Sequence, residues 1–430
     1  MFRHIISIKF ERGYLLQPFA RKPSAQNIYY IYFGISSFLL TLVTSISEIY
    51  YINVVNMNAF QLVLVGTVLE IADFIFEIPT GIMADTKGRK PAIITGAVIT
   101  GLSFILEGAF PIFATVLVSQ VLWSLGYTLI SGSDSAWIAD EIGGQKVELV
   151  FIKGAQIGQA STIVGLIAGA ALATVKISLP IIVGGVLFIF LGLYLSFYMS
   201  ETNFKVIEFE EVNPFKKMFS CFEKSIREIS RSKILIIIIA IAAFEGLYSE
   251  GFDRLWTMHF LKDITIPSIG ISYIVWFSII NSATMFLSIF VMEVIKRKFK
   301  KEEKLTMLWT LSLISFIMMV SVIVFAFSGN FVLALLSYFS CRIMRDVHDP
   351  VYSAWINQNI NEPALRATIL STQSQVSAAG QVVGGPIVGA VATVLSVGFG
   401  IALSGAFVMP MVILYLFAIR KLKRRSSDDR

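Results

Sequence analysis

The sequence predicts an all-α integral membrane protein with twelve transmembrane helices in two similar six-helix bundles. Of its 430 residues, 56% are hydrophobic and 15% are charged, and the mean hydropathy is +0.75. This composition leaves too little polar surface for a soluble globule of this size. Several uncharged runs reach the ~20 residues that a helix needs to cross the hydrocarbon layer. A short motif also recurs about half a chain apart, which indicates two related halves.

The uncharged runs give the crossings in chain order. Leu305–Cys341 and Ala367–Ile419 are each too long for one crossing and contain turn residues, at Ser328–Asn330 and Ser396–Gly400, so each is expected to form two helices. The other crossings are predicted at Ile28–Val54, Ala59–Met83, Pro91–Phe110, Pro111–Ser133, Gly154–Val175, Ser178–Met199, Ile234–His259 and Ile264–Met292.

Basic residues set the expected orientation. One set of loops carries Lys87, Arg89 and Lys90, then Lys216, Lys217, Arg227 and Lys233, then Lys296 to Lys301, and Arg420 to Arg425, whereas the opposite loops hold little beyond Glu107, Lys176, Lys262 and Asp263. Short basic loops stay in the cytoplasm, so both termini are predicted to be cytoplasmic and the protein to be a multi-pass protein of the cell membrane. Anionic membrane lipids attract these cations, so the net charge of +6 requires no nucleic-acid partner.

The crossings divide the chain into five parts. Residues 1–27 form a cytoplasmic segment, either an interfacial helix or a flexible tail. Residues 28–200 and 234–420 form the two bundles, 201–233 form a charged cytoplasmic linker, and 421–430 form a basic tail. Cys221 in the linker and Cys341 in a helix suggest neither a disulfide framework nor a metal site, and no cofactor is expected.

The internal repeat supports two related bundles. Ser135–Ile138 recurs as Ser353–Ile356, and each copy lies at the end of a predicted helix. The helices that follow are both rich in small residues, with Gly158, Gly165 and Gly169 in the first half and Gly380, Gly384, Gly385, Pro386 and Gly389 in the second. Bundles related by an axis along the membrane normal place a binding site between them near the membrane midplane.

A charged turn between the second and third crossings carries the clearest motif. The run GIMADTKGRK, from Gly81 to Lys90, resembles the signature of the major facilitator superfamily at this position, Gly-x-x-x-Asp-x-x-Gly-Arg-Lys/Arg. With the helix count and the central linker, the resemblance covers essentially the whole chain. It implies the major facilitator fold and a transporter.

The resemblance also implies a latch that closes the cytoplasmic side. Asp85 would dock near the cytoplasmic end of the eleventh helix, and Arg89 would strengthen this contact. Gly81, Gly88 and Lys90 complete the turn. The alternative is that these residues only form a tight turn on the cytoplasmic side, although orientation alone requires no aspartate there.

Acidic residues within the second helix are candidates for proton coupling. Glu70, Asp73 and Glu77 share one helical face, and Glu70 lies about halfway across the membrane. An ionised acid at that depth is costly unless it faces water, pairs with a cation or takes up a proton. The alternative is that each acid is neutralised by Lys or Arg on another helix, and for Asp73 both interpretations stay open.

The seventh and tenth helices carry further ionisable residues. Glu245 lies near the centre of the seventh helix and is another proton-coupling candidate, whereas Glu250 and Arg254 are spaced to pair along it. His348 in the tenth helix can titrate near neutral pH and relay protons. Its neighbours equally fit a fixed network that braces the cytoplasmic gate; they are Arg342, Arg345, Asp346 and Asp349.

Aromatic residues near these acids suggest the kind of substrate. The candidate lining residues are Trp123, Tyr127, Phe244, Tyr248 and Trp276, with Trp256 close by. Together with buried carboxylates they suit an amphipathic small molecule that is cationic or zwitterionic, although aromatics in membrane helices also pack or face lipid.

The expected function is secondary active transport by a monomer. The run from Glu77 to Gly81 resembles bacterial multidrug and tetracycline-type exporters, which implies exchange of inward protons for an outward-bound drug-like compound. The alternative is a proton-coupled uptake symporter for a nutrient. A membrane-bound enzyme or receptor is a remote alternative, because there is no nucleotide-binding loop and His4, His259 and His348 offer no catalytic triad.

Overall fold

The computed structural model describes residues 23–143, 147–205, 229–230, 232–267, 270–298, 304–360 and 363–428. Most of the predicted N-terminal segment and linker, and part of the basic loop at 296–301, lie outside these ranges. All regular secondary structure in the described ranges is helical. The helices are α1 (Ala25–Asn53), α2 (Ala59–Lys87), α3 (Arg89–Ala109), α4 (Phe113–Ile130), α5 (Ser133–Ile142), α6 (Val147–Val175), α7 (Leu179–Tyr198), α9 (Lys233–Lys262), α10 (Tyr273–Lys298), α11 (Lys304–Ala326), α12 (Phe331–Gln358), α13 (Pro363–Val394) and α14 (Val397–Asp428).

Twelve long helical units account for the predicted crossings. Eleven are long and apolar enough to span a membrane, and one of these, Phe113–Ile142, joins α4 and α5. The twelfth is α12, whose 28 residues include Arg342, Arg345, Asp346 and Asp349, which lower its hydropathy. It packs against α10 and α11 like a membrane helix. The all-α, twelve-helix prediction is confirmed.

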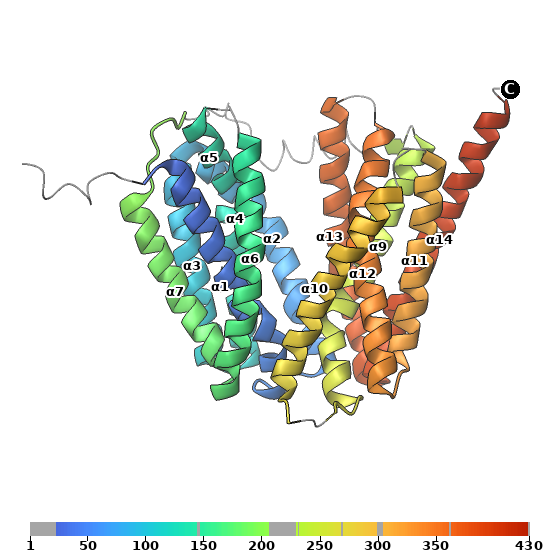
Figure 1. The fold of residues 1–430 in the computed structure, drawn as a ribbon, viewed down its shortest axis with the longest axis horizontal. Helices are drawn as coiled ribbons and strands as arrows, with labels where there is room; N and C mark the ends of the chain where they lie inside the picture. The colour runs from blue at the N-terminus through green and yellow to red at the C-terminus, as the bar shows by residue number, and fades with distance from the viewer. Residues whose placement is uncertain are drawn as a thin grey trace, which may run out of the picture.

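The helices form two groups (Figure 1), and the helices within each group contact one another in the same pattern. In the first group, α1 packs against α6 and α7, and α3 packs against α4 and α7. In the second, α9 packs against α13 and α14, and α11 packs against α12 and α14. Between the groups, α2 contacts α13 and α6 contacts α10, which are equivalent pairs. The contacts therefore reproduce the two-fold repeat predicted from the sequence.

The repeated motif occupies equivalent positions in the two groups. Trp137 lies near the end of the α4–α5 unit and Trp355 lies near the end of α12, and each residue is 2% exposed. The offset that relates these tryptophans also relates Gly132 to Pro350. Gly132 adopts a φ of +77°, which favours glycine and separates α4 from α5. Pro350 lies within α12, where its missing N–H weakens the helix at the equivalent point.

Glycines let neighbouring helices approach closely within each group. A Cβ on Gly101 of α3 would lie 2.5 Å from the carbonyl oxygen of Gly185 in α7. A Cβ on Gly380 of α13 would lie 2.5 Å from the carbonyl oxygen of Ala243 in α9. Small residues serve this purpose in membrane proteins, where helix association depends on close packing. The glycine-rich sequence of α13 is therefore explained in part by packing.

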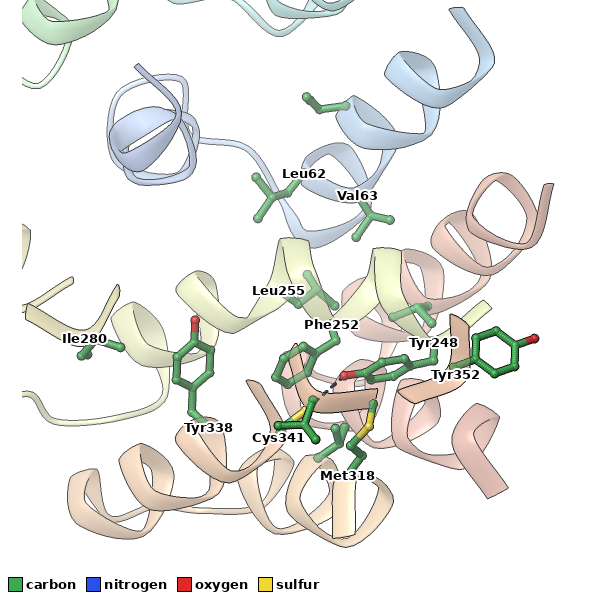
Figure 2. Packing of buried hydrophobic residues seen from close by; sticks show 14 of the residues in the cluster. Leu62, Val63, Tyr248, Phe252, Leu255, Ile280, Met318, Tyr338, Cys341 and Tyr352 are labelled. Carbon is green, nitrogen blue, oxygen red and sulfur yellow. Dashed lines mark hydrogen bonds between the residues drawn. The ribbon is translucent and has the colours of Figure 1, made fainter. Parts of the chain in front are cut away.

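The two groups touch through a buried apolar contact between α2 and α9. Figure 2 shows Leu62 and Val63 of α2 directed toward Leu255 of α9, and all three side chains are fully buried. On the other side of α9, Phe252 stacks near Tyr338 of α12, with ring centroids 6.2 Å apart. In Figure 1 the groups approach each other at this end of the helices and diverge toward the end that carries α5.

Several predicted helix boundaries were wrong; α6, for example, begins at Val147 and not at Gly154. The eighth crossing was expected from Ile264, but α10 begins at Tyr273. Pro267 and Gly270, whose φ is +77°, prevent an earlier start. The fourth crossing was expected to end at Ser133, but α5 continues the same span to Ile142.

Glu107 was placed among the outer loops, and this prediction was also wrong. It lies in α3 with 1% of its surface exposed. Its carboxylate accepts hydrogen bonds from the Tyr51 hydroxyl at 2.9 Å, from the Ser119 hydroxyl at 2.9 Å and from the Gln120 amide at 3.1 Å. Three donors satisfy the buried carboxylate, so it can lie inside the bundle.

Candidate functional site

Three adjoining cavities lie between the two groups, and Glu70 of α2 lines all of them. The central cavity, of about 400 Å³, is lined mainly by charged residues of α1, α2, α9 and α12. The α12 cavity, of about 340 Å³, is lined by Glu245, Asp349 and polar residues of α13. The α2–α13 cavity, of about 310 Å³, contains Asp73 and Glu77. The structure thus brings together the three acids that the sequence placed on one face of α2.

Ion pairs neutralise part of the charge in the central cavity. Glu250 and Arg254 pair at 2.9 Å along α9, as their spacing predicted. Asp253 of α9 pairs with Arg342 at 3.1 Å and with Arg345 at 2.6 Å, both on α12. Two guanidinium groups therefore share one carboxylate, and the Nε of Arg342 is buried without a hydrogen-bond partner among the described residues.

Two carboxylates of the central cavity have no cation partner in the described part of the chain. Glu70 forms no ion pair there, although it lines all three of these adjoining cavities. Glu48 of α1 forms no ion pair either and accepts a hydrogen bond from the hydroxyl of Thr257 in α9. This last bond joins the two groups. Glu48 and Glu70 are thus the groups of this cavity that remain able to bind a proton or a cation.

The predicted network residues of α12 pair mainly with residues of other helices. The carboxylate of Asp346 accepts a hydrogen bond from Ser288 of α10. Adjacent residues on a helix do not face each other, so Asp346 points away from Arg345. The carboxylate that holds the arginines is Asp253, which is brought to them by the packing of α9 beside α12.

His348 joins Glu245 and Asp349 at the α12 cavity. Its Nε2 lies 2.9 Å from the Tyr415 hydroxyl, and its Nδ1 lies 3.3 Å from Asp349 and 3.9 Å from Glu245. The ligand atoms of these three residues lie within 4.8 Å of one another, so they form the group of described residues that could hold a metal ion. The contact with Asp349 is within hydrogen-bond distance and allows a proton to pass between the imidazole and that carboxylate, whereas Glu245 lies beyond it.

The aromatic residues predicted to line the substrate site lie mostly away from the cavities described here. None of the five candidates lines the four cavities described for this chain. Tyr248 is fully buried and bonds to Cys341, with the oxygen and sulfur 3.0 Å apart (Figure 2). Trp123 packs on Phe104, Trp276 packs on Phe331, Phe244 packs against the buried core, and Tyr127 is half-exposed. The aromatic residues that do line the central cavity are Trp256 and Tyr338.

Ion pairs and hydrogen bonds hold the charged turn against other residues of the first group. Gly88, with a φ of +113°, separates α2 from α3. Arg89 lies 3.9 Å from Asp85 and forms a closer ion pair with Asp140 of α5. Glu201, after α7, accepts hydrogen bonds from the backbone N–H groups of Arg89 and Lys90, at 2.6 and 3.2 Å.

Among the described side chains, the ion-pair partner of Asp85 is Arg89, and no contact with α13, the predicted eleventh crossing, is present there. Gly81, on the same turn, has open space where a side chain would stand. The hydrogen bond between α2 and α13 lies at the opposite end, from the Phe60 N–H to the Thr393 hydroxyl at 2.9 Å. The predicted contact of Asp85 with α13 stays a prediction.

Sequence reasoning missed Glu48, Asp253 and Glu201 as site residues. Glu48 was visible as a single acid within the first predicted crossing. Asp253 was assigned no partner, because its cations are far away in the sequence. Glu201 follows a helix and carries no local feature that indicates its bonds to the α3 N-terminus.

Comparison with known proteins identifies the family. The family profile described as Major Facilitator Superfamily matches residues 28–371. The chain belongs to the Major Facilitator Superfamily. It is a multi-pass membrane transporter of small molecules and not an enzyme. A relative among curated proteins is the uncharacterized MFS-type transporter YxaM of Bacillus subtilis (strain 168), with 26% identity over 357 residues, which are 83% of this chain and 85% of YxaM.

Solved structures of superfamily transporters share this fold at low sequence identity. The nucleoside transporter NupG superposes with a TM-score of 0.71 and 16% identity, over 93% of this chain and all of NupG. A bacterial homolog of the human lysosomal transporter Spinster, inward-facing and unoccupied, gives 0.70 and 14%, over 92% and 96% of the two chains. The peptide transporter POT in complex with sulfate gives 0.69 and 16%, over 94% and 95%.

Proposed function

We propose that this transporter couples the inward movement of protons to the export of an amphipathic organic compound by alternating access. It acts as a monomer, because one chain supplies both bundles and every residue of the cavities between them. The basic loops favour a cytoplasmic position for the end that carries α5, which makes the described conformation open toward the cytoplasm.

Glu70 is the observation that carries this proposal. It lies within α2, lines the three adjoining cavities described above, and has no ion-pair partner among the described residues. A carboxylate in a membrane span that lacks a cation is stabilised by water in the cavity or by a bound proton. Opening the cavity first to one side and then to the other lets the same carboxylate exchange a proton with both compartments.

The neighbouring acids extend this route. Asp73 and Glu77 line the α2–α13 cavity, toward the end where the bundles diverge. Glu245 and His348 adjoin the α12 cavity, which Glu70 also lines. We propose that Glu70 binds the coupled proton and that Asp73, Glu77, Glu245 and His348 connect it with the cytoplasm.

The charged turn would control the cytoplasmic side. In the described conformation Arg89 is held by Asp85 and Asp140, within the first bundle. When the cytoplasmic ends of the bundles approach each other, Asp85 would meet the N-terminus of α13, whose positive partial charge attracts a carboxylate. The latch predicted from the sequence is proposed for that second conformation.

Proton-driven transport by the purified protein tests the function. The protein in liposomes with an imposed pH gradient should concentrate a lipophilic fluorescent cation against its own gradient. Glu70→Gln keeps the size of the side chain but cannot carry a proton, so gradient-driven accumulation should fall to the level of empty liposomes. Glu148→Gln, at an exposed acid in the first turn of α6, is the matched control and should transport normally. Full proton-driven accumulation in Glu70→Gln would remove Glu70 from the mechanism.

A proton-coupled uptake symporter is the second candidate, and the arginines of the central cavity favour it. Arg342 lines that cavity with an Nε that has no described partner, so it can bind an anionic group of a polar nutrient. NupG and POT, which share the fold, are by name transporters of nucleosides and peptides. In the liposome assay, substrate that moves in the same direction as protons would establish this alternative.

A further inference from the structure

A side pocket opens from the central cavity between α1, α6, α9 and α10. Its volume is about 280 Å³. Apart from Glu48 its lining is uncharged: it combines hydroxyl and apolar side chains, among them Ser45, Thr162, Leu166 and Phe277, with the amide of Asn281 and the indole of Trp256. The Ser45 hydroxyl is buried and has no hydrogen-bond partner among the described residues, so a bound molecule can supply one.

Glu48 lies where the side pocket meets the central cavity. It lines both spaces, together with Trp256 and Asn281. Thr257 donates a hydrogen bond to its Oε2, and its Oε1 has no partner in the described part of the chain. One carboxylate oxygen therefore remains available to a molecule that occupies both spaces.

Glu48 is open to a cation because the arginines near it, Arg254 and Arg342, form their ion pairs with other acids. The other acids near it, Glu250 and Asp253, are already paired with arginines, and the remaining unpaired acid of the central cavity is Glu70. Trp256 stacks on Tyr338 with ring centroids 4.5 Å apart and presents aromatic surface to both spaces. An ammonium group gains from a carboxylate and from an indole face at the same time.

We propose that Glu48 binds the protonated amine of the transported substrate and that the side pocket holds the uncharged part of the same molecule. The substrate class is thus a small organic amine with one aromatic or branched aliphatic group. The inference rests on the proposed function, because it assumes that these cavities hold the substrate. It assigns separate roles to the two unpaired acids, with the substrate at Glu48 and the proton at Glu70.

Binding to the purified full-length protein tests this assignment. Phenethylamine, 2-phenylethanol and 3-phenylpropionate share a ring and differ in the charge of the other end, and their affinities can be measured by calorimetry. The wild-type protein should prefer the amine by about tenfold or more, as expected for one charge-assisted contact. Glu48→Gln should abolish this preference, whereas Glu70→Gln should retain it. Equal affinities in the wild type, or a preserved preference in Glu48→Gln, would overturn the assignment.

Two further variants separate the effect of the Glu48 charge from the effects of its hydrogen bond and of the space in the side pocket. Thr257→Val removes the hydrogen bond to Glu48 but keeps the carboxylate, so the preference for the amine should persist. Thr162→Phe should fill the side pocket, and should therefore weaken binding of phenethylamine more than binding of methylamine. If Thr162→Phe weakens both amines equally, the side pocket does not hold the ring.

The outcome can be distinguished from failure of the proposed function. Proton uptake into the same liposomes, followed with a pH-sensitive dye, reports coupling without reference to Glu48. A Glu48-dependent amine preference without proton movement would leave the binding assignment intact and remove proton coupling. Proton-driven transport with no Glu48-dependent preference for the amine would leave proton coupling intact and remove the binding assignment.

Discussion

At the scale of single residues, the pairing of Asp253 with Arg342 and Arg345 makes one carboxylate critical for stability. Asp253→Asn leaves two guanidinium groups without a charge partner, whereas Arg345→Gln leaves Asp253 paired with Arg342. Breaking a buried pair costs about 3–5 kcal/mol, and partial exposure of these side chains reduces this to about 1–3 kcal/mol. Thermal unfolding in detergent should therefore show a larger loss of Tm for Asp253→Asn than for Arg345→Gln. Equal losses would show that the arginines do not depend on this carboxylate.

At the scale of helices, the contact between α2 and α13 depends on glycine at the closed end of the molecule, which is the end where the two bundles approach each other. A Cβ on Gly385 would lie 2.9 Å from the Thr67 hydroxyl and 3.0 Å from a Val63 methyl group, both across the interface between the bundles. Gly385→Leu should therefore drive α2 and α13 apart at this end and favour the opposite conformation. Spin labels at Asn58 and Leu395 should report a longer distance by electron paramagnetic resonance.

A variant within one bundle provides the control for this helix-scale prediction. Gly380 packs against α9 of its own bundle, so Gly380→Leu should lower thermal stability and leave the distance between the labels unchanged. An unchanged distance in Gly385→Leu, with the protein folded, would show that the interface tolerates a side chain by local adjustment.

Sequence patterns predicted the helices better than they predicted the ion pairs between side chains of different helices. Uncharged runs and the repeat at Trp137 and Trp355 were sufficient for the twelve-helix, two-bundle fold, because membrane helices satisfy their backbone within each segment. The face shared by Glu70 and its neighbours followed from helical periodicity. The partners of Asp253 did not follow, because they depend on how α9 and α12 pack, and no local pattern encodes that contact.

At the scale of the whole molecule, orientation and conformation together predict which surfaces water reaches from each side. Ser374 lines the α12 and α2–α13 cavities, toward the end expected to face the cytoplasm, whereas Leu395 is exposed at the closed end. In a background with Cys221→Ser and Cys341→Ser, a membrane-impermeant maleimide should modify Ser374→Cys in inverted vesicles but not in intact cells. Leu395→Cys should show the opposite pattern and serves as the control for vesicle sidedness.

Modification of Ser374→Cys from outside the cell, with Leu395→Cys modified from within, would reverse the predicted topology. Modification of both from outside would instead keep the topology and place the resting transporter in the outward-open conformation. In that case the cavity that contains Ser374 would open to the outside, while the loops would keep their predicted orientation.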